Sequence, residues 1–205
     1  MNLPNKLTLG RIIVIPFFVF FLAYNVFDDP NTSRIIAAVL FIGASFTDFL
    51  DGHIARSRNL ITDFGKFMDP LADKFLILGA MFAISFSDYI FDYDAVGFKS
   101  LISSEIISHL FFWTAIIVVF RELAVTSMRL VVVKSSGAVI AASSLGKIKT
   151  VTQIVAVSAV MLEPVVFTFC HGLLTVLSLA LALFFTIVSG VSYIKSYWKF
   201  IDTNK

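Results

Sequence analysis

Six apolar stretches dominate this sequence, and short polar clusters separate them. They cover residues 12–27, 35–46, 75–87, 101–120, 151–170 and 172–194. A helix that crosses a bilayer needs ~20 mostly apolar residues. With 58% hydrophobic and 15% charged residues, the chain is also far more apolar than a soluble domain. The sequence therefore predicts an all-α integral membrane protein, in which six transmembrane helices form a single domain over residues 1–205.

Charge and cysteine content exclude other classes of protein. The formal net charge is only +2, which is too small for a nucleic-acid-binding surface, so we expect no nucleic-acid partner. The single cysteine, Cys170, has no second cysteine with which to form an internal disulfide. The first apolar stretch has no small-residue cleavage pattern, so we interpret it as a retained helix rather than a signal peptide.

The second and third apolar stretches are too short to cross a bilayer without polar residues. They reach the required length only if one helix continues through Asp48 and Asp51 and the next begins at or before Asp69 and Asp73. Four carboxylates then lie on two consecutive helices at the same face of the membrane.

The distribution of basic residues predicts the orientation, because Lys and Arg prefer cytoplasmic loops. With a cytoplasmic N-terminus, all 16 basic residues except Arg34 and Lys99 fall on the cytoplasmic side. We therefore expect a multi-pass protein of the cell membrane with both termini in the cytoplasm. The four aspartates would face the cytoplasm as well.

Ionisable residues within membrane helices are costly and mark functional sites. Four carboxylates at close range repel one another unless a cation lies between them. Neither His nor Cys belongs to the set, and ligands that are all oxygen favour a hard cation, Mg²⁺ or Mn²⁺. Small residues, Gly52 and Ala55 on one helix and Gly65 on the next, leave room beside the carboxylates for a large ligand.

These residues match a known motif. The pattern Asp48-x2-Asp51-Gly52-x2-Ala55-Arg56-x8-Gly65-x3-Asp69-x3-Asp73 resembles the signature of the CDP-alcohol phosphatidyltransferases, membrane enzymes with six spanning helices. The resemblance implies that the chain binds CDP-diacylglycerol and two divalent cations, and that an acceptor hydroxyl displaces CMP. It also implies a homodimer surrounded by membrane lipids.

The resemblance assigns a role to each residue of the motif. Asp48, Asp51 and Asp69 correspond to metal ligands, and Asp73 to the base that deprotonates the acceptor while also contacting metal. The CDP-diacylglycerol site would include the following residues: Asn5, Thr8, Gly52, Ala55, Arg56, Thr62 and Gly65.

Further segments resemble the family members that use sn-glycerol 3-phosphate as the acceptor. They are residues 2–11, Arg121 with Glu122 and Arg129, and residues 144–153. The phosphate of this acceptor requires cations, because the metal ions already neutralise the CDP pyrophosphate. We expect these cations to be Arg11, Arg121, Arg129 and Lys147.

Three other interpretations remain open. Another acceptor, such as inositol phosphate, serine or phosphatidylglycerol, would keep the family and change the product. A small ion-coupled transporter would also carry acids within its helices, although such sites usually lie near the midplane between related halves. A structural scaffold would show neither metal dependence nor turnover.

Overall fold

The computed structural model describes residues 2–27, 29–57, 62–136 and 144–198, and this part of the chain is all-helical. It contains six α-helices and one short 3₁₀ helix. In order, they are α1 (Leu3–Ala23), α2 (Pro30–Ser57), α3 (Asp63–Phe86), α4 (Ser104–Ser136), α5 (Ser144–Leu162), η1 (Thr168–Cys170) and α6 (Leu173–Trp198).

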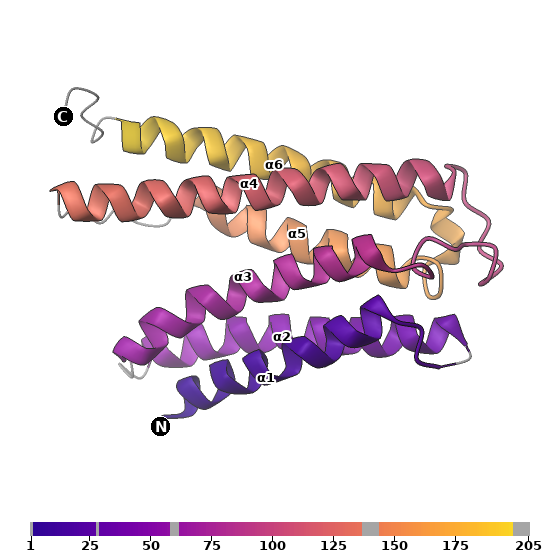
Figure 1. The fold of residues 1–205 in the computed structure, drawn as a ribbon, viewed down its shortest axis with the longest axis horizontal. Coiled ribbons are helices and arrows are strands. Elements are labelled where there is room, and N and C mark those ends of the chain that lie inside the picture. The colour runs from indigo at the N-terminus through magenta and orange to yellow at the C-terminus, as the bar shows by residue number, and fades with distance from the viewer. Residues whose placement is uncertain (1, 28, 58–61, 137–143, 199–205) are drawn as a thin grey trace.

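The helices form two groups of three that run side by side (Figure 1). In the first group α1 packs against α2 and α3, and in the second α6 packs against α4 and α5. Contacts of α2 with α5 and of α3 with α4 join the groups. Buried side chains such as Phe18, Phe41, Leu76 and Phe111 form a core that spans the two groups.

Four helices are long and apolar enough to cross a membrane. The qualifying segments of the described chain are Pro4–Ala23, Pro30–Leu50, Ser144–Leu162 and Leu173–Trp198. Large apolar side chains, among them Phe17, Val39 and Leu177, are more than half exposed on the outside of the bundle. Lipid would cover such side chains, so the chain is a membrane protein.

The predicted extension of the second and third helices is confirmed. Helix α2 continues through Asp48 and Asp51 to Ser57, and α3 begins at Asp63, before Asp69 and Asp73. Thr62 caps α3, because its hydroxyl accepts a hydrogen bond from Gly65 N–H (3.0 Å). These four aspartates therefore lie near the end of α2 and the start of α3, at the end of the bundle where α1 begins and α6 ends (Figure 1).

The fifth apolar stretch, residues 151–170, is not helical throughout. Helix α5 ends at Leu162 and is followed by Glu163 and Pro164. Proline disfavours helical backbone at the residue before it, and Glu163 uses its side chain elsewhere. That buried carboxylate accepts hydrogen bonds from Gly172 N–H (2.7 Å) and Thr175 N–H (2.6 Å) at the start of α6.

Arg34 closes the opposite end of the bundle, away from the start of α1 and the end of α6. It is fully buried on α2 and donates from Nη2 to Tyr89 O (2.5 Å) in the α3–α4 connection. Tyr89 in turn donates its hydroxyl proton to Phe21 O of α1 (2.5 Å). Burial raises the pKa of Tyr89 to about 12, against the opposing charge of Arg34. The tyrosine therefore keeps this proton at neutral pH, and the contacts fix the connection to α1 and α2.

Candidate active site

One face of α1 carries three polar residues near the N-terminus of the chain. Asn5, Thr8 and Arg11 are 7%, 1% and 2% exposed, whereas Lys6, the other charged residue of α1, is exposed. Burial of polar groups is costly unless they are hydrogen-bonded or paired. Each of these three residues has its partner on α2 or at the start of α3.

Two of the contacts from α1 involve aspartates of the motif. Thr8 Oγ1 donates to Asp69 Oδ1 on α3 (2.7 Å), and Arg11 Nη1 donates to Asp48 Oδ1 on α2. The Arg11 side chain is fully buried, whereas that of Asp48 is 35% exposed. Helix α1 therefore fixes one carboxylate on each of the two helices that carry the motif.

Thr62 and Gly65 link the start of α3 to α1. Besides capping α3, Thr62 donates its hydroxyl proton to Asn5 Oδ1 (3.0 Å). A Cβ atom at Gly65 would lie 3.3 Å from both Asn5 Oδ1 and Thr62 Oγ1, and 3.5 Å from Asp69 Oδ2. Glycine at this position thus allows α1 and α3 to approach each other beside the carboxylates.

Three aspartates of the motif, Asp48, Asp69 and Asp73, have side chains that the structure describes. The charge of Asp48 interacts with those of Asp69 and Asp73. The backbones of Asp51, Ala55 and Arg56 belong to α2, but their side chains lie outside the described part of the structure, so their roles stay predictions. Among the side chains that are described, no three acidic, His or Cys groups meet closely enough to hold a metal ion.

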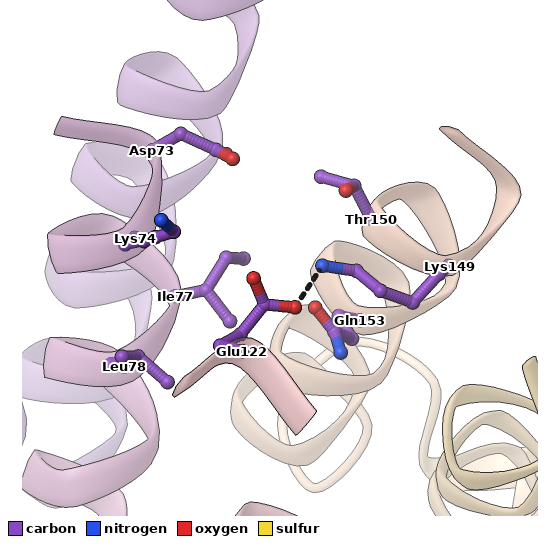
Figure 2. A pocket seen from close by; sticks show the side chains of 8 residues that line it. All are labelled: Asp73, Lys74, Ile77, Leu78, Glu122, Lys149, Thr150 and Gln153. Carbon is purple, nitrogen blue, oxygen red and sulfur yellow. Dashed lines mark hydrogen bonds and ion pairs between the residues drawn. The ribbon is translucent and has the colours of Figure 1, made fainter. Parts of the chain in front are cut away.

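Next to Asp73, a cavity opens between α3, α4 and α5 (Figure 2). Asp73, Lys74, Ile77 and Leu78 line it from α3, Glu122 from α4, and Lys149, Thr150 and Gln153 from α5. Asp73 lies at one end of the group of side chains, and Glu122 and Gln153 lie at the other (Figure 2). The cavity therefore places two ammonium groups near the carboxylate that the motif assigns as the base.

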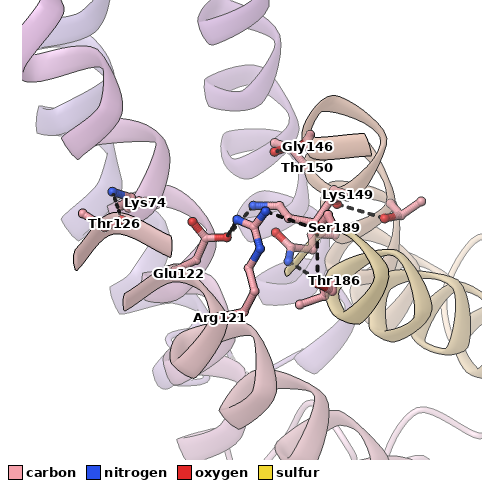
Figure 3. A network of polar contacts seen from close by, with 11 residues as sticks. Lys74, Arg121, Glu122, Thr126, Gly146, Lys149, Thr150, Thr186 and Ser189 are labelled. Atoms are coloured by element: carbon pink, nitrogen blue, oxygen red, sulfur yellow. Dashed lines mark hydrogen bonds and ion pairs between the residues drawn. The ribbon is translucent and has the colours of Figure 1, made fainter. Parts of the chain in front are cut away.

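A polar network holds these cations in place (Figure 3). Glu122 Oε1 accepts hydrogen bonds from Lys149 Nζ (2.6 Å) and from Arg121 Nη1 (2.8 Å). Lys74 Nζ donates to Thr126 Oγ1 on α4 (2.8 Å). Glu122 and Arg121 belong to α4, whereas Lys149 belongs to α5. The ion pair between Glu122 and Lys149 therefore connects these two helices beside the cavity.

The predicted acceptor cations occupy different environments. Arg121 extends towards α6, where Nη2 donates to Ser189 Oγ (3.2 Å) and the guanidinium lies 5.3 Å from the centre of the Tyr193 ring. Arg11 is paired with Asp48, as described above. Arg129 on α4 and Lys147 on α5 are exposed. Their assignment to the acceptor phosphate stays a prediction.

Sequence reasoning placed Glu122 and residues 144–153 in segments that resemble the family, but of the residues that line this cavity it assigned only Asp73 to the site. Lys74, Lys149 and Gln153 line it, yet the motif does not include them. The available signal was the presence of Glu122 and Gln153 within otherwise apolar helices, since buried polar side chains in a membrane require partners. Which partners they find depends on how three helices pack, and that information is not local in the sequence.

Comparison with known proteins agrees with the motif. The family model of the CDP-alcohol phosphatidyltransferases matches residues 1–188. A Bacillus subtilis protein named CDP-diacylglycerol--glycerol-3-phosphate 3-phosphatidyltransferase is 39% identical over 211 residues, which cover 99% of this chain and 98% of the relative. A Rickettsia felis protein of the same name is 34% identical, with 97% of each chain covered. A Mycobacterium tuberculosis protein named probable phosphatidylglycerophosphate synthase is 33% identical, covering 94% of this chain and 80% of the relative.

Proposed function

This chain belongs to the CDP-alcohol phosphatidyltransferase family, and we propose that it transfers the phosphatidyl group of CDP-diacylglycerol to sn-glycerol 3-phosphate. The products are phosphatidylglycerophosphate and CMP. The observation that carries this proposal is the placement of the aspartate motif on α2 and α3, in a chain that matches relatives named for this activity along nearly its whole length.

The junction of α1, α2 and α3 is the proposed site for CDP-diacylglycerol. Its residues are Asn5, Thr8, Gly52, Ala55, Arg56, Thr62 and Gly65. The contacts among Asn5, Thr8, Thr62 and Asp69 support this proposal, because they hold polar atoms in a fixed arrangement at the end of apolar helices. A lipid with a nucleotide headgroup needs both features: apolar surface for its acyl chains and polar groups for its pyrophosphate.

We assign two divalent cations, Mg²⁺ or Mn²⁺, to Asp48, Asp51 and Asp69, with additional contact from Asp73. The donor set supports this assignment, since these carboxylates and the neighbouring Thr8 hydroxyl offer only oxygen. When bound, the cations would supply positive charge for the pyrophosphate and for the departing CMP. We expect turnover to stop on chelation and to return with Mg²⁺ or Mn²⁺, and full activity in a verified metal-free preparation would contradict the assignment.

Asp73 is the proposed base, and the adjoining cavity is the proposed acceptor site. A carboxylate oxygen of Asp73 would accept the proton of the attacking hydroxyl. Lys74 and Lys149 line the same cavity and can receive the acceptor phosphate as charge-assisted donors. Arg11, Arg121, Arg129 and Lys147 remain candidates for the same phosphate, and Arg121 would have to leave Glu122 to reach it.

The same proposal includes the setting of the enzyme. All six helices would cross the cell membrane as one domain of residues 1–205, with both termini and the aspartates on the cytoplasmic side. The start of α1 and the end of α6 lie at the same end of the bundle, which supports placing both on one side of the membrane (Figure 1). Membrane lipids would surround the bundle, and the active form would be a homodimer.

The experiment that tests this function is an acceptor panel. Purified protein is incubated with CDP-diacylglycerol, a divalent cation and one acceptor at a time, and CMP release is measured while the lipid product is identified by its mass. Phosphatidylglycerophosphate formed with glycerol 3-phosphate is the expected result. Preference for inositol phosphate, serine or phosphatidylglycerol would change the acceptor but keep the family chemistry. No CMP release with any acceptor would contradict the proposal that this protein transfers a phosphatidyl group.

A further inference from the structure

Gln153 is a fully buried amide on α5 that lines the cavity beside Asp73 (Figure 2). Its Nε2 donates a hydrogen bond to Thr186 Oγ1 on α6 (2.9 Å). Its Oε1 has no hydrogen-bond partner among the residues that the structure describes. The side chain is thus anchored at one end of the amide, and the other end is an acceptor at the cavity.

A buried amide oxygen without a partner is uncommon, because desolvation removes its bonds to water and nothing replaces them. The two ammonium groups that line the cavity already donate hydrogen bonds to other side chains. Lys149 donates to Glu122, and Lys74 donates to Thr126. Gln153 Oε1 is therefore suited to a ligand that brings a hydroxyl or amine donor into the cavity.

The remaining groups narrow the class of ligand. Lys74 and Lys149 offer ammonium protons for a phosphate, although Lys149 also pairs with Glu122 of the same cavity. Asp73 and Gln153 Oε1 provide two separate acceptors. Phosphate together with two hydroxyls is the chemistry of glycerol 3-phosphate. If the proposed function holds, one hydroxyl attacks the phosphatidyl group near Asp73, which leaves the C2 hydroxyl for another acceptor.

We propose that Gln153 determines acceptor specificity, with Oε1 accepting a hydrogen bond from the C2 hydroxyl of glycerol 3-phosphate. This inference rests on the proposed function and adds a residue outside the aspartate motif to it. Thr186 acts as the positioning residue, because its hydroxyl accepts from Nε2 and turns the oxygen of the amide towards the cavity.

The test compares glycerol 3-phosphate with 3-hydroxypropyl phosphate, the same molecule without the C2 hydroxyl. A site built to bond a hydroxyl rejects the analogue that lacks it, because its own buried acceptor is left unpaired. We expect kcat/KM of the wild-type enzyme to favour glycerol 3-phosphate by about 100-fold or more. In Gln153→Met, which keeps the volume but removes the acceptor, the ratio should fall to roughly tenfold or less.

A matched control removes a buried polar group elsewhere. Thr114 is buried on α4, and its hydroxyl donates to Leu110 O within the same helix (2.7 Å). Thr114→Val should keep the wild-type preference. A purely structural role of Gln153 would lower kcat/KM for both acceptors by the same factor and leave their ratio unchanged, which would overturn the inference.

The remaining outcomes are also decisive. Equal use of the two acceptors by the wild-type enzyme would overturn the specificity role while leaving the proposed function intact. Absence of turnover with both acceptors would overturn the proposed function and the inference with it. If Gln153→Met does not accumulate in membranes, Thr186→Val decides, because it retains the amide and removes its anchor. A reduced preference in that variant supports the inference, and an unchanged preference contradicts it.

Discussion

Gly65 lies where polar groups of α1 and α3 meet, and it allows them to approach closely. Replacement by alanine would place a methyl group 3.3 Å from both Asn5 Oδ1 and Thr62 Oγ1. Both neighbours would have to move by a few tenths of an ångström. Alanine also favours helix over glycine and restricts the unfolded chain, which contributes about 0.4–1 kcal/mol in the stabilising direction. Binding of CDP-diacylglycerol should therefore weaken without loss of the fold.

For Gly65→Ala we expect a decrease in kcat/KM for CDP-diacylglycerol of about tenfold or more, because small displacements of positioning groups are costly in catalysis. Thermal unfolding in detergent should change little. Gly43→Ala on α2 is the matched control, since no atom lies within 4 Å of the added methyl group. Equal activity of the two variants would place the donor site away from Gly65.

Asp73 is the residue on which the proposed chemistry depends most. In Asp73→Asn, the amide has nearly the same shape but cannot take the proton of the acceptor hydroxyl. General-base catalysis contributes about 10²–10⁴-fold, so kcat should fall by at least that range while CDP-diacylglycerol still binds. Asp63→Asn, at an exposed position in the first turn of α3, should remain active. CMP release is the measurement, and a near-normal kcat in Asp73→Asn would show that Asp73 is not the base.

The sequence predicted the carboxylates of the site but not the partners that hold them. The aspartates follow a fixed spacing along two neighbouring helices, so their pattern can be found by inspection of the chain. The bonds from Thr8 to Asp69 and from Arg11 to Asp48 join residues separated by 61 and 37 positions. Such contacts depend on the rotation of α1 about its axis, which an apolar helix with few polar residues does not specify locally.

Helix α6 depends on a carboxylate from outside the helix. Glu163 is fully buried and accepts hydrogen bonds from Gly172 N–H and Thr175 N–H at the positive end of α6. Glutamine would replace one of these acceptor oxygens by an NH₂ group. We expect Glu163→Gln to lower the free energy of unfolding by about 1–3 kcal/mol, because a buried N–H loses its acceptor.

This loss should appear as a lower melting temperature in detergent, by about 2–4 °C for each kcal/mol in a chain of this size. Activity at low temperature should persist, because Glu163 lies at the end of the bundle away from the aspartates (Figure 1). Glu105→Gln, an exposed substitution in the first turn of α4, should leave the melting temperature unchanged. An identical melting temperature for both variants would contradict the capping role of Glu163.

The helices also show which element boundaries can be predicted. The extents of α2 and α3 followed from a physical requirement, because their apolar segments alone are too short for a bilayer. The end of α5 did not follow, since apolar residues such as Val165, Val166 and Phe167 continue beyond it. Only the Glu163–Pro164 pair indicates that the helix ends here. The Glu163 carboxylate then accepts a hydrogen bond from Thr175 N–H in α6 instead of continuing α5.

At the scale of the whole molecule, charge is distributed unevenly between the two ends of the bundle. Lys6 near the start of α1 and Lys195 in the last turn of α6 lie at the same end of the bundle as the aspartates, and both are exposed. Lys99 is exposed in the connection between α3 and α4 at the other end. Arg34 is also near that end, but it is buried and donates to backbone carbonyls rather than facing the surroundings.

This asymmetry makes the proposed orientation testable with single cysteines. Cys170 is replaced by serine first, because it is the only cysteine of the chain. Lys6→Cys, Lys99→Cys and Lys195→Cys are then made separately in that background. Since positively charged connections stay in the cytoplasm, a membrane-impermeant maleimide added to intact cells should label Lys99→Cys alone. Lys6→Cys and Lys195→Cys should react only after the cells are opened.

The labelling pattern also tests the position of the active site, because the aspartates lie at the same end as residues 6 and 195 (Figure 1). CDP-diacylglycerol and glycerol 3-phosphate carry phosphate charges that do not cross a bilayer unaided. A site that uses both must therefore open to the compartment that contains the water-soluble acceptor. Labelling of Lys6→Cys and Lys195→Cys in intact cells, with Lys99→Cys protected, would reverse the orientation and place the aspartates outside. Labelling of residues 6 and 195 from opposite sides would instead require an odd number of membrane spans.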